Sequence, residues 1–220
     1  MVKALTFKIT SESNGMKKYP LYFSLLITLY TVFNTAWATQ SILLLGDSVS
    51  AGYQMSPEES WAYLLNERLE DEKAPYRLIN ASISGETTSG GLSRLPAILA
   101  NEKVDHLLIE LGGNDGLRGY APKRIKSNLL QMISMAQERD IKVSLIKIKI
   151  TPNYGPRYLA LFEKVYDDIA EETGVTLFPF FMEKIAQDPN LMMADGIHPN
   201  KEAQPLIATY VGEQLKQMMN

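Results

Sequence analysis

The sequence predicts an α/β fold of three layers, in which helices cover both faces of a central, mostly parallel, five-stranded sheet. Short apolar runs typical of buried strands alternate along the chain with longer segments whose apolar residues recur at helical spacing. Three of the strand-like runs end in glycine-rich turns. Such turns at the carboxyl ends of parallel strands are where open α/β sheets place their ligand sites.

The five predicted strands are short and rich in leucine, isoleucine and valine. They lie at 41–45, 76–80, 106–111, 142–150 and 175–178. In the fourth, Lys147 and Lys149 alternate with apolar residues. One end of that strand is therefore expected to have an exposed or pocket-lining face.

The helices are predicted from the period of their apolar residues. They lie at 60–73, around 92–99, and at 121–139, 158–173 and 201–218. In the first, the polar residues from Asn66 to Glu72 are expected to face water. Gly174 ends the fourth at the usual C-terminal position. In the last, we expect the apolar residues from Leu206 to Leu215 to form the inner face.

Composition limits the functions that this chain can have. Its 220 residues are 45% hydrophobic and 21% charged, which suffices for one well-buried domain. The formal net charge of -3 gives no electrostatic basis for binding nucleic acid. With two histidines and no cysteine, the chain offers few ligands for a transition metal, so we expect neither a metal nor a cofactor.

Residues 1–38 differ in composition from the rest. Two lysines at 17–18 precede an uncharged run at 19–37, and the segment ends in Ala36-Trp37-Ala38. This order is typical of a secretory signal peptide. We therefore expect a periplasmic or secreted protein whose residues 39–220 form one domain.

Met16 directly precedes the two lysines and is a candidate translation start. The alternative to a signal peptide is an uncleaved membrane anchor. The apolar run is shorter than the roughly 20 residues that a spanning helix needs, which favours cleavage.

Candidate catalytic residues follow the first strand and precede the last helix. Ser48 lies in the turn Gly46-Asp47-Ser48, and Asp195 and His198 lie three residues apart in another turn. Serine hydrolysis requires a nucleophile, a base oriented by a carboxylate, and donors for an oxyanion. Each turn alone is equally compatible with an ordinary polar bend. His106, at the start of a strand, is interpreted as structural.

Four segments, taken in order, resemble the GDSL or SGNH hydrolase family: Gly46-Asp47-Ser48, Gly85, Gly112-Gly113-Asn114-Asp115 and Asp195-Gly196-Ile197-His198-Pro199. Within the family, the stretches 80–85, 110–119 and Asn153-Tyr154-Gly155 resemble the bacterial periplasmic thioesterases and lysophospholipases. The resemblance covers essentially all of residues 39–220. It implies the flavodoxin-like arrangement of this family.

The resemblance also implies residue roles. Ser48 is the nucleophile, His198 is the general base and then the acid, and Asp195 orients His198. The oxyanion hole comprises the backbone N–H groups of Ser48 and Gly85 and the side-chain amide of Asn114.

Further residues take their roles from the same resemblance. Leu117, Asn153 and Tyr154 are substrate-binding residues, and Asp47 braces the turn. The proline before the Asn-Tyr-Gly loop stands one position later than is usual in the family's thioesterases, after Thr151. Acyl-chain preference is therefore not transferred to this chain.

The implied function is that of a serine esterase, and we expect a monomer without stable membrane insertion after signal cleavage. It hydrolyses small-molecule acyl thioesters and carboxyl esters, lysophospholipids and aryl esters included, through an acyl-enzyme. The alternatives are a carbohydrate O-acetylesterase of the same family and a catalytically silent lipid-binding protein. A long apolar groove favours the first function, whereas a short polar pocket favours the acetylesterase.

Overall fold

The computed structural model describes residues 39–150 and 152–219. The predicted signal peptide and the candidate start at Met16 lie outside these residues. Within them, one five-stranded sheet has the order β2-β1-β3-β4-β5, and each neighbouring pair of strands is parallel. The strands are β1 (Gln40–Gly46), β2 (Tyr76–Asn80), β3 (His106–Glu110), β4 (Lys142–Ile146) and β5 (Thr176–Phe178). This is the flavodoxin-like strand order.

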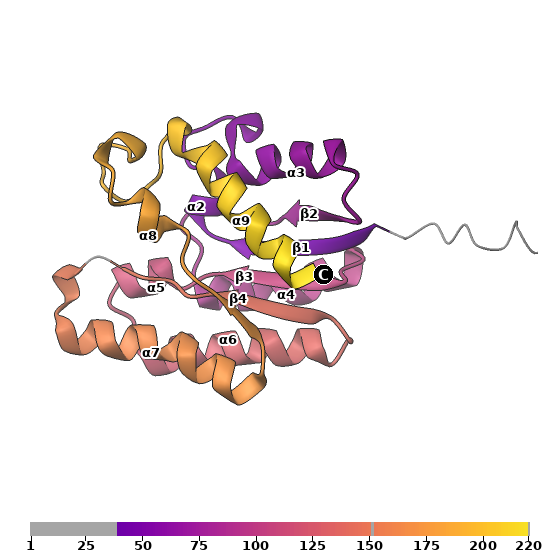
Figure 1. Ribbon diagram of the computed structural model, residues 1–220. Helices are drawn as coiled ribbons and strands as arrows, with labels where there is room; N and C mark the ends of the chain where they lie inside the picture. The colour runs from indigo at the N-terminus through magenta and orange to yellow at the C-terminus, as the bar shows by residue number, and fades with distance from the viewer. Residues whose placement is uncertain (1–38, 151, 220) are drawn as a thin grey trace, which may run out of the picture. The chain divides into compact units, whose positions relative to one another are not determined.

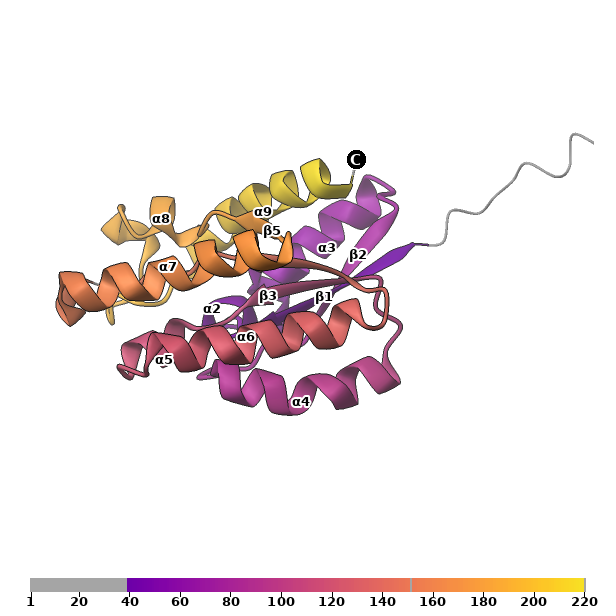
Figure 2. The same cartoon turned by 90° about the horizontal axis from the view of Figure 1, so that it is seen from below.

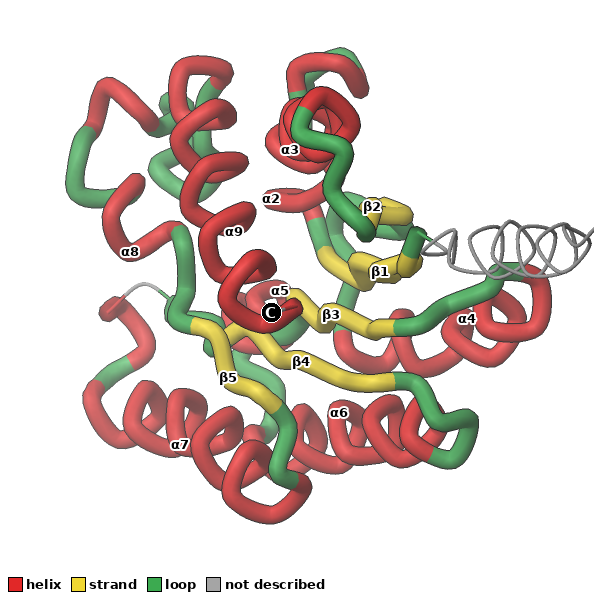
Figure 3. Tube along the Cα trace, turned by 45° about the vertical axis from the view of Figure 1, so that its right-hand side comes forward, coloured by secondary structure: helices red, strands yellow, loops and turns green. Residues whose placement is uncertain are grey.

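Helices cover both faces of the sheet, which confirms the predicted three layers (Figure 3). One face carries α3 (Trp61–Asp71) and α9 (Gln204–Met219), which pack against each other. Figure 2 shows α4 (Thr88–Asn101), α6 (Pro122–Gln137) and α7 (Pro156–Thr173) side by side on the other face. Within the described residues, no helix has the length and apolar character needed to cross a membrane.

Three short helices gather at the carboxyl edge of the sheet. They are α2 (Ser48–Ala51), α5 (Gly113–Leu117) and α8 (Met182–Ile185). The strand arrows in Figure 1 point toward the end of the molecule where these helices lie. β1 and β3 are neighbours in the sheet, so the turns that follow them meet at the point where the strand order reverses. This is the position at which such sheets place ligands.

The central strands form the middle of the hydrophobic core. Ile42–Leu45 in β1 and Leu107–Ile109 in β3 have no exposed surface. Helices cover both faces of these parallel strands, so the strands are continuous apolar runs instead of alternating ones. Trp61, Phe162 and Tyr166 are the largest fully buried side chains, and they fill the space between the sheet and its helices.

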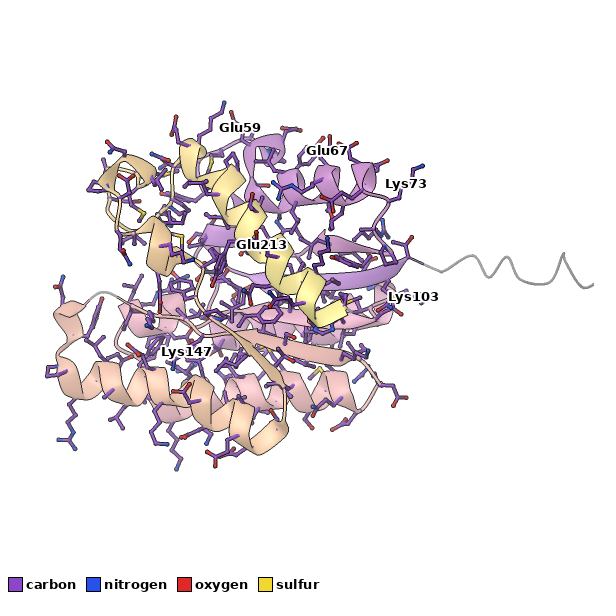
Figure 4. All side chains as sticks on the ribbon, viewed as in Figure 1. Glu59, Glu67, Lys73, Lys103, Lys147 and Glu213 are labelled. Carbon is purple, nitrogen blue, oxygen red and sulfur yellow. The ribbon has the colours of Figure 1, made fainter. Side chains whose placement is uncertain are left out.

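Two helical residues differ from expectation. Asn66 does not face water: its side chain bonds the N–H and the C=O of Leu78 in β2, at 2.8 and 2.9 Å. The acidic residues Glu67, Glu70 and Asp71 of α3 are exposed as expected, and Glu67 projects outward in Figure 4. Leu206 was expected on the inner face of α9 but is 51% exposed, because the buried stripe runs through Ile207 and Val211 instead.

The fourth strand is shorter than its apolar alternation predicted. β4 ends at Ile146 instead of Ile150. The ladders end there because β3 stops at Glu110 and β5 at Phe178. The N–H of Lys147 still donates to the C=O of Phe178 at 2.8 Å, and the chain then leaves the sheet. Ile148 remains buried after the strand ends. The extra apolar residues line a cavity, as described below.

Candidate active site

The turn after β1 presents Ser48 at the start of α2. Asp47 caps this helix by accepting a hydrogen bond from the backbone N–H of Val49 at 3.1 Å. Gly52 ends the helix in the left-handed conformation, with φ 72°. Ser48 is 8% exposed. The short helix therefore holds the serine hydroxyl at the sheet edge, with little surface open to water.

Ser48, His198 and Asp195 form a continuous chain of hydrogen-bonding contacts. Ser48 Oγ lies 2.9 Å from His198 Nε2, and His198 Nδ1 lies 2.7 Å from Asp195 Oδ2. An ionised carboxylate only accepts hydrogen bonds, so the proton of the neutral imidazole is assigned to Nδ1. Nε2 is then free to accept the hydroxyl proton of Ser48. This is the arrangement of a serine nucleophile with its base.

The backbone around Asp195 keeps that carboxylate charged. Desolvation acts to raise the pKa of Asp195, but hydrogen bonds outweigh it and lower the pKa to about 2. Asp195 Oδ1 accepts from the N–H groups of Ile197 at 2.9 Å and His198 at 3.0 Å, and Oδ2 faces the imidazole. The tight turn is closed by Gly196 at φ 66°. The same turn thus positions both the base and the group that orients it.

Tyr53 is a residue at this site that sequence reasoning missed. Its ring stacks on the imidazole of His198, with centroids 4.2 Å apart and planes 27° apart. The electron-rich face of an aromatic ring attracts a nearby cation, so this stack favours the imidazolium form. The sequence carries no signal for the stack, because the contact spans 145 positions of the chain (198 minus 53).

Asn114 reaches the site from the turn after β3, whereas Gly85 is not among the residues that line the cavity described below. Asn114 lies in α5, directly after β3, and one N–H of its amide donates to Asp47 Oδ2 at 3.1 Å. An asparagine amide has two N–H donors, so one remains for a ligand. Gly85 has φ +78°, which disfavours other residues, and its C=O accepts from Arg118 Nη2 at 3.2 Å.

A cavity of about 530 Å³ opens beside Ser48, His198 and Asn114. Its volume lies in the range of small-molecule sites. Leu117 lines it, as the resemblance implied. The other apolar side chains are Val49, Ile148, Ile150, Phe180, Met182, Ala186, Met192 and Ile197. The lysine between the two isoleucines, Lys149, lines the cavity and pairs with Glu183, so the expected pocket-lining face follows β4.

Comparison with known proteins gives the family. Residues 44–205 match the model of the GDSL-like lipase/acylhydrolase family. The chain belongs to this family. It is therefore an esterase of the SGNH type, and Ser48, Asn114, Asp195 and His198 all lie within the matched span of this GDSL hydrolase.

Characterised relatives of this GDSL hydrolase cover most of its length. It is 46% identical to an arylesterase of Vibrio mimicus over 86% of this chain and 95% of the relative. It is 41% identical to thioesterase 1/protease 1/lysophospholipase L1 of Escherichia coli K12, over 94% and 97%. The structure is similar to the esterase EstA of Pseudoalteromonas sp. inhibited by monoethylphosphonate. Their TM-score is 0.81 and their identity 44%, covering 82% of this chain and 99% of EstA.

Two further residues named by the resemblance lie beyond the cavity. Asn153 is exposed and is not among the residues that line the cavity of this GDSL hydrolase. The hydroxyl of Tyr154 donates to the C=O of Leu117 at 2.7 Å. Tyr154 thus touches the cavity wall through the backbone of a lining residue.

Two buried carboxyl groups underlie the catalytic turn. Asp47 is 4% exposed and Glu110 is 1% exposed, and both reach the inner end of the cavity. Burial raises the pKa of Asp47 to about 6, against the lowering effect of its hydrogen bonds with Val49 and Asn114. The Asp47 carboxylate accepts hydrogen bonds from the N–H of Val49 and the amide of Asn114, and the structure shows no hydrogen bond between it and the imidazole of His198. Glu110 begins one of the stretches that carry the family resemblance, but the sequence assigned it no role.

Proposed function

We propose that this protein is an exported serine hydrolase that cleaves carboxyl esters and acyl thioesters with medium or long acyl chains, lysophospholipids included. One observation carries the proposal. Ser48 and His198, the first two members of the contact chain that leads to Asp195, line a cavity whose wall is mainly apolar. A nucleophile and an acyl-sized apolar site are therefore available together.

Acylation follows from the hydrogen-bond order. Ser48 Oγ attacks the carbonyl carbon of the substrate while His198 Nε2 takes the hydroxyl proton, and Asp195 stabilises the resulting imidazolium. The negative charge that develops on the carbonyl oxygen is met by the N–H groups of Ser48 and Gly85 and by the free amide N–H of Asn114. The carbon–oxygen or carbon–sulfur bond then breaks, and His198 returns the proton to the departing alkoxide or thiolate.

Deacylation repeats these steps with water. His198 takes a proton from the water molecule, whose oxygen attacks the acyl carbon on Ser48. The tetrahedral intermediate collapses, the bond to Ser48 Oγ breaks, and the proton passes from His198 back to the serine. The products are a carboxylic acid and the free enzyme. Inhibition of EstA by monoethylphosphonate supports this course, because a tetrahedral phosphorus resembles such an intermediate.

The cavity supports an acyl chain over an acetyl group. Each methylene removed from water contributes about 0.8 kcal/mol to binding, so a mainly apolar cavity of about 530 Å³ rewards a chain that fills it. A carbohydrate O-acetylesterase requires a short polar pocket instead. The names of the relatives, arylesterase and thioesterase 1/protease 1/lysophospholipase L1, agree with broad ester and thioester substrates.

Export is supported by the sequence pattern of residues 17–38, in which two lysines precede an apolar run and Ala36-Trp37-Ala38. We propose a periplasmic or secreted monomer released by cleavage after Ala38. Its export is tested by expressing the full chain in a Gram-negative host and sequencing the amino terminus of the protein in the periplasmic fraction. Retention of residues 1–38 in the membrane fraction would support the anchor instead.

A panel of p-nitrophenyl esters from acetyl to palmitoyl tests the proposed activity. We expect an optimum at medium or long chains that disappears in Ser48→Ala, followed by hydrolysis of lysophosphatidylcholine and of an acyl-CoA. An optimum confined to the acetyl ester would support the carbohydrate O-acetylesterase instead. A folded protein that binds fatty acid without turnover of any ester would support the lipid-binding alternative.

A further inference from the structure

We propose that Glu110 is a positioning residue for the nucleophile, and that its buried carboxyl group holds the turn on both sides of Ser48. The inference rests on the proposed function, because it takes Ser48 as the nucleophile. Glu110 is the last residue of β3 and lies in register with Gly46, the last residue of β1. It is thus the residue of the neighbouring strand that stands directly beside the start of the catalytic turn.

Two hydrogen bonds connect Glu110 to this turn. Its Oε2 accepts from the backbone N–H of Asp47 at 3.2 Å and from the hydroxyl of Ser50 at 2.9 Å. The residues that it holds lie immediately before Ser48 and two positions after it. Since both partners are buried, the carboxyl group restrains the path of the backbone that carries the nucleophile.

Gly46 makes this contact sterically feasible. A Cβ atom at position 46 would lie 2.7 Å from Glu110 Oε2 and 2.9 Å from the Cβ of Ser50. Both distances are too short for unbonded atoms, so a side chain there would displace the carboxyl group or the turn. The glycine of the Gly-Asp-Ser motif therefore leaves the space that Glu110 occupies.

The influence of Glu110 extends to the oxyanion side through Asp47. The backbone of Asp47 is held by Glu110, and its side chain caps α2 with Oδ1 and accepts from the Asn114 amide with Oδ2. A displacement of Asp47 would move Ser48 and Asn114 together. Misplacement of reacting groups by about 1 Å costs about 100-fold in rate.

The surroundings of Glu110 disfavour the charged form of its carboxyl group. It is 1% exposed, and among the described residues no lysine, arginine or histidine forms an ion pair with it or with Asp47. Burial, together with the nearby charge of Asp47, holds the pKa of Glu110 well above its ordinary value. A carbonyl oxygen on a neutral group suffices for both hydrogen bonds that it accepts.

The test compares Glu110→Gln, which keeps a neutral group with a carbonyl oxygen, with Glu110→Leu, which removes the acceptor. We measure kcat and KM on the preferred p-nitrophenyl ester and melting temperature by circular dichroism. We expect Glu110→Leu to lose about 100-fold in kcat with little change in KM. Glu110→Gln should recover kcat to within about tenfold of the wild type, the equivalent of one hydrogen bond.

The controls separate positioning from stability. His106→Asn, at the opposite end of β3, should lower the melting temperature without changing kcat. A folded Glu110→Leu with wild-type kcat would overturn the proposal, as would a Glu110→Gln as impaired as the leucine variant. If Glu110→Leu does not fold, Ser50→Ala decides: a fall in kcat of about fivefold supports positioning, and no change overturns it.

Ser48→Ala in the same assay separates this inference from the proposed function. If Ser48→Ala keeps its activity, the proposed nucleophile is wrong. If Ser48→Ala is inactive while both Glu110 variants retain wild-type kcat, the inference about Glu110 alone fails.

Discussion

The two ends of strand β3 each bury a titratable side chain, but these side chains have different contacts. His106, at the amino end, is 4% exposed and bonds Ser144 Oγ at 3.0 Å within the sheet. Glu110, four residues on, bonds the turn that carries Ser48. At the amino edge of the sheet, the buried side chain contacts only other structural residues. The carboxyl edge is followed by the loops that form the site. The position of these two buried groups therefore suggests different roles. His106 stabilises the sheet, and Glu110 contacts the turn of the site.

The pKa shifts by themselves do not separate the two ends. Burial lowers the pKa of His106 to about 4 and raises the pKa of Glu110 well above its ordinary value. In both cases the low-dielectric interior favours the neutral form. For these two residues the shifted pKa marks burial, and only the contacts show which part of the molecule each group holds.

The largest expected effect lies at the carboxyl edge. Ser48→Ala should reduce kcat on p-nitrophenyl esters by about 10⁴- to 10⁶-fold, because no other group can form the acyl-enzyme. Its melting temperature should stay close to that of the wild type. Ser134→Ala, on the exposed face of α6, is the control for a serine hydroxyl lost elsewhere. Appreciable turnover by Ser48→Ala would contradict the assignment of Ser48 as the nucleophile.

Asn114→Ala is expected to have the next largest effect on catalysis. Removing one oxyanion donor costs about 100- to 1,000-fold in kcat. The loss should appear in kcat, with KM nearly unchanged, because the charge on the oxygen develops only in the transition state. Steady-state kinetics at several chain lengths measure the split. A large rise in KM with unchanged kcat would assign Asn114 to ground-state binding instead.

At the amino edge, His106 should affect stability and its dependence on pH. The unfolded chain binds a proton on this residue below its ordinary pKa of 6.5, but the folded protein does so only below about 4. Stability is therefore lost as pH falls from about 6.5 to about 4, by on the order of 3 kcal/mol. Urea unfolding at pH 7 and pH 4.5 should show a smaller loss in His106→Asn than in the wild type. An equal loss in both proteins would show that His106 does not titrate in this window.

The smallest expected effect concerns the stack of Tyr53 on His198. Tyr53→Leu removes the aromatic face and should lower kcat about two- to fivefold, the equivalent of about 0.5–1 kcal/mol of cation–π attraction. Tyr53→Phe keeps the ring and should retain wild-type kcat. A phenylalanine variant as slow as the leucine variant would instead assign the effect to the hydroxyl.

The sequence was sufficient for the fold because its local signals agree with one another. Apolar runs such as Leu43–Leu45 cannot be exposed to water, and their alternation with amphipathic helices favours a parallel sheet. The ends of elements were less accurate. The alternation at Lys147–Ile150 continues past β4, because it serves the wall of a cavity after the strand partners have ended.

Candidate site residues could also be predicted from the sequence where several of them lie in one short motif. Gly46-Asp47-Ser48 and Asp195-Gly196-Ile197-His198 each place several polar groups within one turn, and the resemblance to a family joined them. The structure brings Ser48 and His198 into contact across 150 positions. The exposure of Asn66 and Leu206 was predicted wrongly. The helical period of apolar residues does not show which element will pack against each face of a helix.

By itself, the sequence determined the layers, the strand types and the candidate nucleophile, base and orienting carboxylate, because these depend on apolar period and on turn chemistry within a few residues. The tertiary structure alone decided the contacts of Glu110 with the turn, the stack of Tyr53 on His198, and the walls of the cavity. Those contacts join side chains on different elements. They exist only once strand register and helix packing have set the distances between them.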